Sequence, residues 1–497
     1  MTFIENFVPF SIILCMGAGI ISSALKGRTS RRFSIIILSV VLILSCFVLG
    51  YTVYLGHAFV YVMGKFPAPW GNELRAGCLE GLMAVFFSVI MLLSVVGGIR
   101  GQNDDIREDK MNLYFIMIDL MMASLLALVY TNDLFTAYVF VEINTMAACA
   151  LIMIRDNGHT LVAATKYMIM SLLGSGLLLI GISMLYTITG QLLMPNIHEA
   201  VVRLNETGEY AIPLTVVIGL MSVALAIKSA LYPFHSWLPE AYGYSTASSS
   251  AILSSLVSKG YIFLLIKIFY RVIGMDVMVG HKITNILFVF GIIGMIMGSV
   301  TAIRQTDVRH LIAYSSIAQI GYIYMGMGLG SNAGMVAAIF HIMSHGATKS
   351  MLFIAQRGLV EVSSGSKDFS DLKGSGFRNR LAGLAFAVGA FSMVGVPLLA
   401  GFTSKVYFAE AAITAVRVKM WIAMITLAIS TILNAVYFIR AVISVYTPRN
   451  MEYKDSSYKP STNMAFALIC FIIFNFFLGI LSYPIANTIE TGLKVFD

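Results

Sequence analysis

Charged residues are scarce in this chain of 497 residues. Asp, Glu, Lys and Arg together make up 12% of it, whereas 58% of its residues are hydrophobic. So few charged side chains cannot cover the surface of a water-soluble globule of this size. The composition therefore excludes an ordinary soluble enzyme and predicts an integral membrane protein.

Cysteine pairs and metal-ligand clusters are also lacking. No CxxC motif or Cys/His cluster occurs, and zinc, iron–sulfur and haem sites are built from such groups. We therefore expect no metal, no prosthetic group or other cofactor, and no disulfide framework. The isolated cysteines are Cys15, Cys46, Cys78, Cys149 and Cys470.

The basic charge balance does not require a nucleic-acid partner. A net charge of +8 also arises when the loops on one side of a membrane collect Lys and Arg, so we expect no nucleic-acid binding. The apolar N-terminal stretch has no basic residue before Lys26. It is therefore interpreted as a first membrane span and not as a signal peptide.

Long apolar runs are what the sequence has in abundance. A helix needs roughly 20 residues to cross a hydrocarbon core of about 30 Å. The alternating pattern of a β-barrel is absent, so helices must satisfy the backbone in lipid. The sequence predicts an all-α polytopic membrane protein with about 14 transmembrane helices. The fourteen runs are 5–25, 33–56, 78–99, 111–130, 134–154, 164–188, 211–238, 246–272, 283–303, 310–330, 334–355, 381–409, 418–446 and 462–487.

Lys and Arg gather in the connections on one side of this predicted bundle. By the positive-inside rule these connections face the cytoplasm, which places both termini outside a cell inner (cytoplasmic) membrane. The longest connections, 189–210 and 356–380, hold no plausible catalytic domain, so we expect the protein to act inside the bilayer. The basic connections are 26–32, 100–110, 304–309, 357–380 and 449–459.

A weak internal repeat links two parts of the chain. The stretches ATKYMIMSLLGSG, from Ala164, and ATKSMLFIAQRG, from Ala347, share Ala-Thr-Lys-x-Met at a separation of 183 residues. Lys228 and Lys405 are 177 residues apart, each in a span interrupted by proline. Five predicted spans separate the copies, so the second copy crosses the membrane in the opposite direction. Inverted repeats with broken helices are typical of secondary transporters.

Several ionisable residues fall inside the predicted spans. One such group at mid-bilayer costs at least about 2.5 kcal/mol on insertion scales. Lysines outnumber acids, and an excess of buried cations is a poor static design, although Lys166 could snorkel to the membrane surface. The candidates for proton transfer are Glu142, Lys228, Lys259, His341, His345, Lys349 and Lys405, with Lys166 and His235 as additional candidates.

Two histidines and a lysine fall on one helical stripe. His341, His345 and Lys349 are spaced i, i+4 and i+8,. The stretch HIMSH has Ile342 where a zinc-protease helix needs glutamate. Two interpretations remain open: the histidines hydrogen-bond across helices, or they pass protons, since imidazole titrates near neutral pH and binds protons at either nitrogen.

Two prolines interrupt spans that carry a lysine. Pro233 frees the carbonyl of Ser229, beside Lys228,. Pro397 frees that of Met393, before another lysine,. Freed carbonyls and the water they recruit would solvate an ammonium and let the helix flex. For Lys228 the alternative to a switchable charge remains a static salt bridge that locks the helix packing.

Five stretches follow one another from about residue 220 to 410: KSALYPFHSWLPEAY, SSLVSKG, DVRHLIAYSSIAQIGY, HIMSHGATKSMLF and GVPLLAGFTSKVYF. Together they resemble the antiporter-like subunit family, the large membrane subunits of respiratory complex I, membrane-bound hydrogenases and multisubunit Mrp cation/proton antiporters. Glu142 lies at the family's place on the fifth span. The chain length and Lys405 favour the Mrp D-like and hydrogenase-associated branch over subunits with a long C-terminal lateral helix.

This resemblance implies a line of interacting groups. Glu142 and Lys228 match the family's ion pair, and Lys259 matches the lysine that links this pair to a central hydrated axis. His341, His345 and Lys349 match that axis, and Lys405 matches the site on the twelfth span. The resemblance also implies two inverted five-helix units, which divide the chain into 1–110, 111–275 (first repeat), 276–447 (second repeat) and 448–497.

One stretch departs from the family's pattern. After HSWLPEAY, relatives usually carry an acidic residue or histidine and a Pro-Thr pair, whereas this chain reads GYSTASSSAILSS. We therefore expect a changed ion entrance near the seventh and eighth spans.

The leading hypothesis is a proton- or sodium-translocating subunit that works with other membrane subunits. Redox chemistry in its partners, in an Mrp-linked hydrogenase or a complex I-type NADH-quinone oxidoreductase, or an opposing ion gradient would drive it, because the chain has no redox site of its own. A carrier of small solutes fits less well, since the polar residues form a line and not a pocket. A structural scaffold with inert ion pairs is the third hypothesis.

Overall fold

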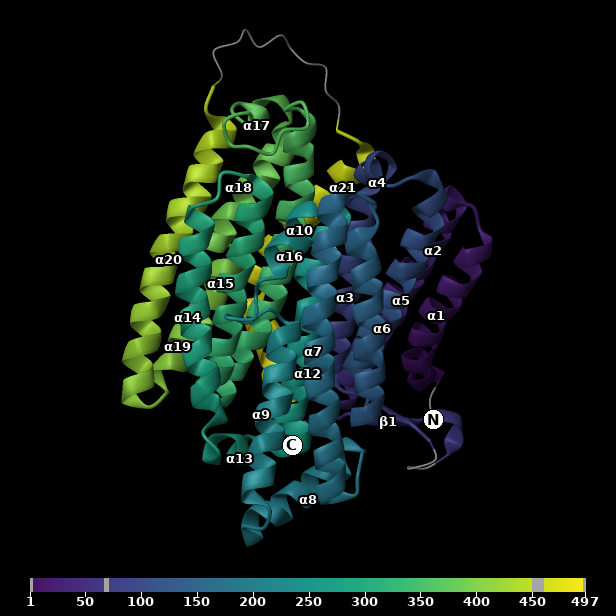
Figure 1. The fold of residues 1–497 in the computed structure, drawn as a ribbon, viewed down its shortest axis with the longest axis vertical. Coiled ribbons are helices and arrows are strands. Elements are labelled where there is room, and N and C mark those ends of the chain that lie inside the picture. The colour runs from purple at the N-terminus through teal and green to yellow at the C-terminus, as the bar shows by residue number, and fades with distance from the viewer. Residues whose placement is uncertain (1–2, 67–70, 449–459, 495–497) are drawn as a thin grey trace.

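The protein is a bundle of long helices (Figure 1), seen in a computed structural model that describes residues 3–66, 71–448 and 460–494. Eleven of the described helices are long and apolar enough to cross a membrane. A helix satisfies its own backbone hydrogen bonds, which hydrocarbon surroundings require. The predicted class, a helical polytopic membrane protein, is confirmed.

The N-terminal part of the chain, residues 3–110, adds a small hairpin that the apolar runs did not predict. Its two strands are antiparallel, with Phe59 opposite Ala76 and Val62 opposite Glu73. The elements of this part are η1 (Phe3–Asn6), α1 (Phe7–Ala24), α2 (Gly27–Leu55), β1 (Phe59–Val62), η2 (Met63–Lys65), β2 (Glu73–Ala76), α3 (Cys78–Gly97), α4 (Ile99–Asp105) and η3 (Glu108–Lys110).

The middle part, residues 111–280, contains two π-helical turns, η4 and η5, on either side of α12. It also contains α8, a surface helix inside the connection 189–210. The elements are α5 (Met111–Tyr130), α6 (Leu134–Met153), α7 (Gly158–Thr189), α8 (Met194–Thr207), α9 (Ala211–Lys228), α10 (Leu238–Tyr244), α11 (Ala247–Ile252), η4 (Leu253–Val257), α12 (Ser258–Ile268), η5 (Phe269–Ile273) and α13 (Met275–Gly280).

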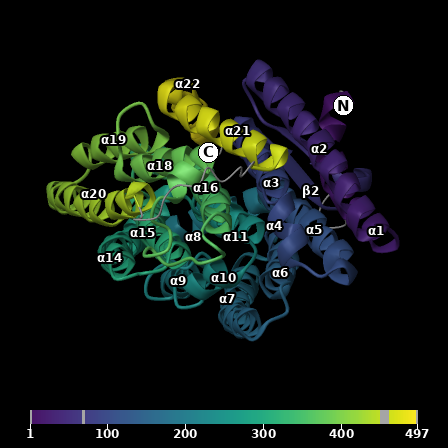
Figure 2. The ribbon, with the colours of Figure 1, turned by 90° about the horizontal axis from the view of Figure 1, so that it is seen from above.

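The C-terminal part, residues 283–494, supplies the centre of the bundle and one flank. Figure 2 shows α16 in the middle of the molecule, and it packs against α15, α18, α19 and α21. The elements are α14 (Ile283–Ile303), α15 (Val308–Gly328), α16 (Asn332–Glu361), α17 (Ser375–Arg378), α18 (Arg380–Val394), α19 (Ala400–Ile413), α20 (Arg417–Tyr446), α21 (Thr462–Ile480) and α22 (Ser482–Lys494).

Helices occupy all fourteen ranges predicted as spans, but in three of these ranges no single helix is both long enough and apolar enough to cross a membrane. They are the range of α15, the range of α16 and the range of the broken pair α18 and α19. Two of these ranges, those of α16 and of α18 with α19, carry buried polar candidates or a helix break. The count of fourteen and the inverted repeats therefore remain predictions.

The two termini lie at the same, lower end of the molecule in Figure 1, whereas α4 and α17 lie at the upper end. The basic connections 26–32, 100–110 and 357–380 belong to the upper end, and the connection 449–459 falls outside the described residues. Which end faces the cytoplasm remains a prediction.

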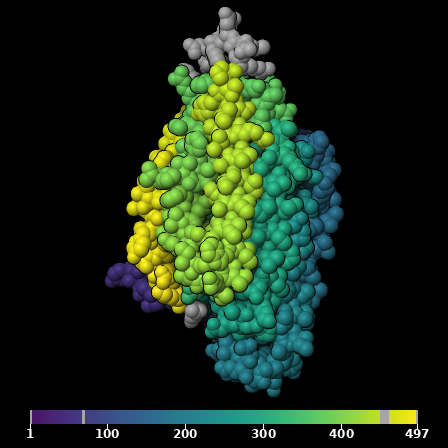
Figure 3. Space-filling view, turned by 90° about the vertical axis from the view of Figure 1, so that its left-hand side faces the viewer, coloured from purple at the N-terminus to yellow at the C-terminus, as the bar shows by residue number. Residues whose placement is uncertain are grey.

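Apolar side chains cover the outside of the bundle. Figure 3 shows α20 along one outer face, with the α8 region, in blue, at the lowest point. On α20, Ile425 is 55% and Ile432 is 64% exposed. Such a surface suits lipid or another membrane subunit, and not water.

Candidate functional site

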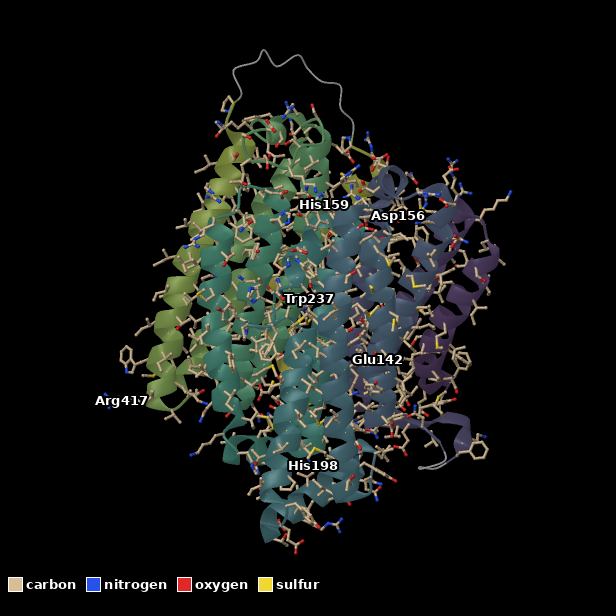
Figure 4. The ribbon with its side chains drawn as sticks, viewed as in Figure 1. Glu142, Asp156, His159, His198, Trp237 and Arg417 are labelled. Atoms are coloured by element: carbon tan, nitrogen blue, oxygen red, sulfur yellow. The ribbon has the colours of Figure 1, made fainter. Side chains whose placement is uncertain are left out.

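The seventh predicted span is broken immediately after its lysine. Helix α9 ends at Lys228 and α10 begins only at Leu238. The indole nitrogen of Trp237 donates to the carbonyl of Ile227 at 3.2 Å, which satisfies one backbone group that the break leaves free. Figure 4 shows Trp237 and Glu142 at mid-height in the bundle. Trp237 is 2% exposed, so the break that holds it lies in the interior of the bundle.

Lys228 is fully buried and contacts two oxygen-bearing side chains. Its ammonium donates to the Thr145 hydroxyl at 2.8 Å and lies 3.7 Å from a carboxylate oxygen of Glu142. Ser175 donates a hydrogen bond to the same carboxylate. Gly174 leaves room for the lysine, because a Cβ there would lie 3.0 Å from Lys228 Cγ. The side chain of Glu142 is 24% exposed, so this carboxylate is the more accessible partner.

The contact that Pro233 led us to expect, between the Lys228 ammonium and the Ser229 carbonyl, does not occur among the described contacts of Lys228. The proline predicted that the Ser229 carbonyl would solvate the ammonium, whereas the ammonium instead contacts side chains of α6. The Ser229 hydroxyl lies 2.8 Å from that of Tyr324. The helix already ends at Lys228, so the local geometry is not that of a continuous helix with one missing bond.

A π-helical turn positions Lys259. The turn η4 places the Ser254 carbonyl where it accepts from the ammonium, and Ser258 Oγ accepts at 3.1 Å. π-turns change which carbonyls are bonded within a helix, and they are frequent at functional sites. Lys259 is fully buried, and no carboxylate of the described residues lies within ion-pair distance of it.

The stripe of His341, His345 and Lys349 lies on one face of α16, as spaced in the sequence. The two imidazole rings are nearly parallel, with centroids 5.9 Å apart. His341 Nδ1 lies 3.0 Å from the Ser404 hydroxyl, whereas neither ring nitrogen of His345 reaches a hydrogen-bond partner in the described part of the chain. Lys349 donates to the Ile312 carbonyl at 2.6 Å and to the Ser315 hydroxyl.

The break in the twelfth predicted span holds Lys405 through backbone carbonyls. Helix α18 ends at Val394 and α19 begins at Ala400. The Lys405 ammonium donates to the carbonyls of Met393, at 3.2 Å, and Val394, at 2.6 Å. The first of these is the carbonyl that Pro397 was expected to free.

Aromatic rings connect the separate lysines to their neighbours. Lys228 Nζ lies 5.5 Å from the centre of the Tyr261 ring, on the same helix as Lys259. The rings of Tyr322 and His341 stack with centroids 5.5 Å apart. Lys405 Nζ lies 5.9 Å from the centre of the Tyr322 ring. Tyr322 therefore lies between the histidine stripe and the second helix break.

The two additional candidates lie apart from this line. Lys166 is half-exposed and forms an ion pair with Glu240 at 2.5 Å, which suits the snorkelling alternative. His235 lies inside the first break, where its ring stacks on Tyr232 with centroids 5.0 Å apart. The contacts of the described residues join neither of them to the buried lysines.

Sequence reasoning missed a second set of buried charged groups. Lys267, eight residues after Lys259 on α12, donates to three carbonyls at the end of α5. Arg75 and Glu80 form a buried ion pair at 2.6 Å. The i, i+8 spacing of the two lysines on one helix is the signal that could have identified Lys267.

Arg309 also corrects an expectation. The charge pattern assigned it to a basic cytoplasmic loop, but it is 4% exposed and donates to the Ser245 carbonyl at 2.6 Å. Ser248, in the same serine-rich stretch, accepts from Gln102 and lies 2.5 Å from the Tyr114 hydroxyl. The stretch that departs from the family's pattern is thus buried between helices.

Comparison with known proteins places these features in a family. The family described as "NADH:quinone oxidoreductase/Mrp antiporter, TM" matches residues 131–433. The NADH-quinone oxidoreductase subunit N of Desulforudis audaxviator is 32% identical over 401 residues, which cover 80% of this chain and 77% of that protein. The D-type Na(+)/H(+) antiporter subunit of Alkalihalophilus pseudofirmus is 27% identical over 80% of this chain and 78% of its own length.

The whole fold is also that of a solved subunit. A chain in the structure of the Mrp complex from Dietzia sp. DQ12-45-1b superimposes with a TM-score of 0.87, at 21% identity, over 100% of this chain and 98% of that one. Some relatives are longer, and this chain spans 49% and 44% of two staphylococcal proteins. The match over residues 131–433 shows that the chain belongs to the NADH:quinone oxidoreductase/Mrp antiporter transmembrane family.

Proposed function

We propose that this protein is a proton-translocating, antiporter-like subunit of a multisubunit membrane complex. Protonation changes along Glu142, Lys228, Lys259, the stripe from His341 to Lys349, and Lys405 as ion pairs open and close. The observation that carries the proposal is the set of contacts made by the buried lysines. Of the four lysines in this line, only Lys228 forms an ion pair with an acid among the described residues.

The hydrogen-bond partners suit amines that gain and lose a proton. An ammonium has three N–H donors, whereas a neutral amine has two donors and a lone pair. Lys259, Lys349 and Lys405 each donate to two oxygens. A neutral amine can keep both bonds and still accept a proton, so these sites do not require a permanent charge.

The pair of Glu142 and Lys228 supplies the movable charge. The carboxylate is more exposed than the amine and has Ser175 as a second partner. When the carboxylate moves away, the buried ammonium loses its counter-charge and releases its proton more readily. The helix break beside Lys228 provides a point at which the span can flex.

The driving force distinguishes two classes of complex. An Mrp-type cation/proton antiporter, or a hydrogenase linked to one, is the first proposal, and a complex I-type NADH-quinone oxidoreductase is the alternative. Family membership and the named relatives support both. Protons suit the line of amines and imidazoles better than sodium does, because hard metal ions are bound by clustered oxygen ligands. A scaffold with inert ion pairs is the remaining alternative.

The membrane and the orientation are part of the proposal. We place the protein in the inner, cytoplasmic membrane with the upper end in the cytoplasm and both termini outside, since the basic connections lie at that end. Residues 111–275 and 276–447 are proposed as two inverted repeats. The two helix breaks, each with a lysine beside it, support that assignment.

Replacing Lys228 by alanine tests the proposal against the scaffold. We expect the complex to assemble and proton translocation to fall to background, because the relay loses its first amine. Lys419→Ala is the control: Lys419 donates to the backbone carbonyl of Gly328 at 2.7 Å and lies outside the line. Translocation at the wild-type rate in assembled Lys228→Ala would support the scaffold.

A further inference from the structure

A buried acid lies outside the line described above. Asp119 is in the middle of α5, is 0% exposed, and was not among the residues singled out from the sequence. Ser34 of α2 donates to its Oδ2 at 2.7 Å, and Ser22 of α1 does so at 3.5 Å. The three helices α1, α2 and α5 pack against one another around it.

No counter-charge accompanies this acid. None of the described basic residues forms an ion pair with Asp119, whose partners are the two serine hydroxyls. Its second oxygen, Oδ1, has no hydrogen-bond partner in the described residues. A bare carboxylate in such surroundings is costly. A permanently neutral acid would also be expected to have an acceptor for its own O–H.

A cavity of about 820 Å³ opens above Asp119, where α2 and α5 begin. Thr29 lines it, and the next residue, Ser30, is fully buried with an unpartnered hydroxyl. Ser30 and Ser34 are four residues apart, so they lie on one face of α2. Ser30 therefore lies on α2 between Thr29 at the cavity and Ser34 at the carboxyl group, and its hydroxyl is free to bond in either direction.

Helices α1 and α5 also run from the cavity toward Asp119. Met111 of α5 lines the cavity, and Asp119 follows eight residues, or about 12 Å, deeper on the same face,. Leu25 lines the cavity at the end of α1, and Ser22 is one turn below it. The helices meet closely at the rim, because a Cβ on Gly27 would lie 2.6 Å from Met111 Cβ.

We infer that Asp119 is a second proton-binding site, loaded from this cavity through Ser30 and Ser34 and separate from the line between Glu142 and Lys405. The ligand is a proton and not a metal ion. Both serine partners donate their hydrogens to the carboxylate, and a hard metal ion would need more oxygens than the two hydroxyls and one carboxylate. This inference goes beyond the proposed function and does not depend on it.

Infrared spectroscopy of the complete chain in membranes tests the site. The difference between wild type and Asp119→Asn identifies the band of the protonated carboxyl group, in samples whose folding is checked by size-exclusion chromatography. We expect the band to decrease as pH rises and to shift on transfer to deuterated water. Absence of the band at every pH, or a band that neither titrates nor exchanges, would overturn the inference.

The route and the ligand are tested in the same experiment. Ser30→Ala should slow the deuterium exchange of the band about tenfold, which corresponds to about 1.4 kcal/mol. Ser45→Ala should not, because Ser45 is equally buried on α2 but lies 3.4 Å from Ser88. Equal slowing in both variants contradicts the route. Loss of the band on adding Na⁺ at constant pH shows a metal-ion site and contradicts a site for protons.

Discussion

The number of oxygens around each buried lysine distinguishes two kinds of site. Lys259, Lys349 and Lys405 each donate to two oxygens, whereas Lys267 donates to three carbonyls at the C-terminal end of α5. Three acceptors match the three donors of an ammonium, and the end of a helix favours a cation. We therefore propose that Lys267 has a structural role and that the other three lysines transfer protons.

Alanine substitutions should separate these two roles. Lys267→Ala leaves three buried carbonyls without their donor, so we expect it to destabilise the protein by about 3 kcal/mol. Lys259→Ala should lower proton translocation much more than stability. Thermal unfolding and proton flux, measured on both variants, check this. Equal stability losses in the two variants would contradict the assignment.

The missed residues show what the sequence can and cannot reveal at this scale. His341, His345 and Lys349 could be predicted as one stripe because a helix has a fixed period. Asp119 could not be associated with its serine partners, because these come from α1 and α2, and a pairing between helices leaves no spacing pattern in the sequence. Arg309 was assigned to a loop because a single arginine at a helix start does not reveal its depth.

At the scale of elements, broken helices and π-turns bring backbone carbonyls to the lysines. Proline predicted both breaks, but not their form. After α18 the chain turns through Gly395, at φ 97°, and carbonyls at the end of that helix bind Lys405. After α9, the indole of Trp237 donates a hydrogen bond to the free carbonyl of Ile227, and the ammonium of Lys228 donates to a side chain of α6. The π-turn at Lys259 had no signal in the sequence.

Gly395→Ala tests the second break. A left-handed backbone costs a residue with a Cβ about 1–2 kcal/mol, and the new Cβ would lie 3.1 Å from Lys405 Cδ. We expect a modest loss of stability and a larger loss of proton flux. Gly219→Ala is the control, since a Cβ there meets nothing within 4 Å. Unchanged flux in Gly395→Ala would show that the geometry of this break is unimportant.

At the scale of the whole molecule, the apolar runs predicted a helical membrane protein, and the family match agrees with the motif-based resemblance. The hairpin of β1 and β2 and the surface helix α8 were missed, because short elements in connections lack a long periodic pattern. The helix that carries the histidine stripe, α16, lies at the centre of the molecule and packs against α18 and α19, the helices of the second break, and against the π-turn η4.

The most direct test of proton transfer through these lysines is proton flux in proteoliposomes that contain the complete complex with Lys259→Arg or Lys405→Arg. Arginine keeps the positive charge and the donors, but it does not release its proton. We predict that both variants assemble and that proton flux falls to background in each. Wild-type flux in either assembled variant would contradict the account, because the lysine would then act only as a fixed charge.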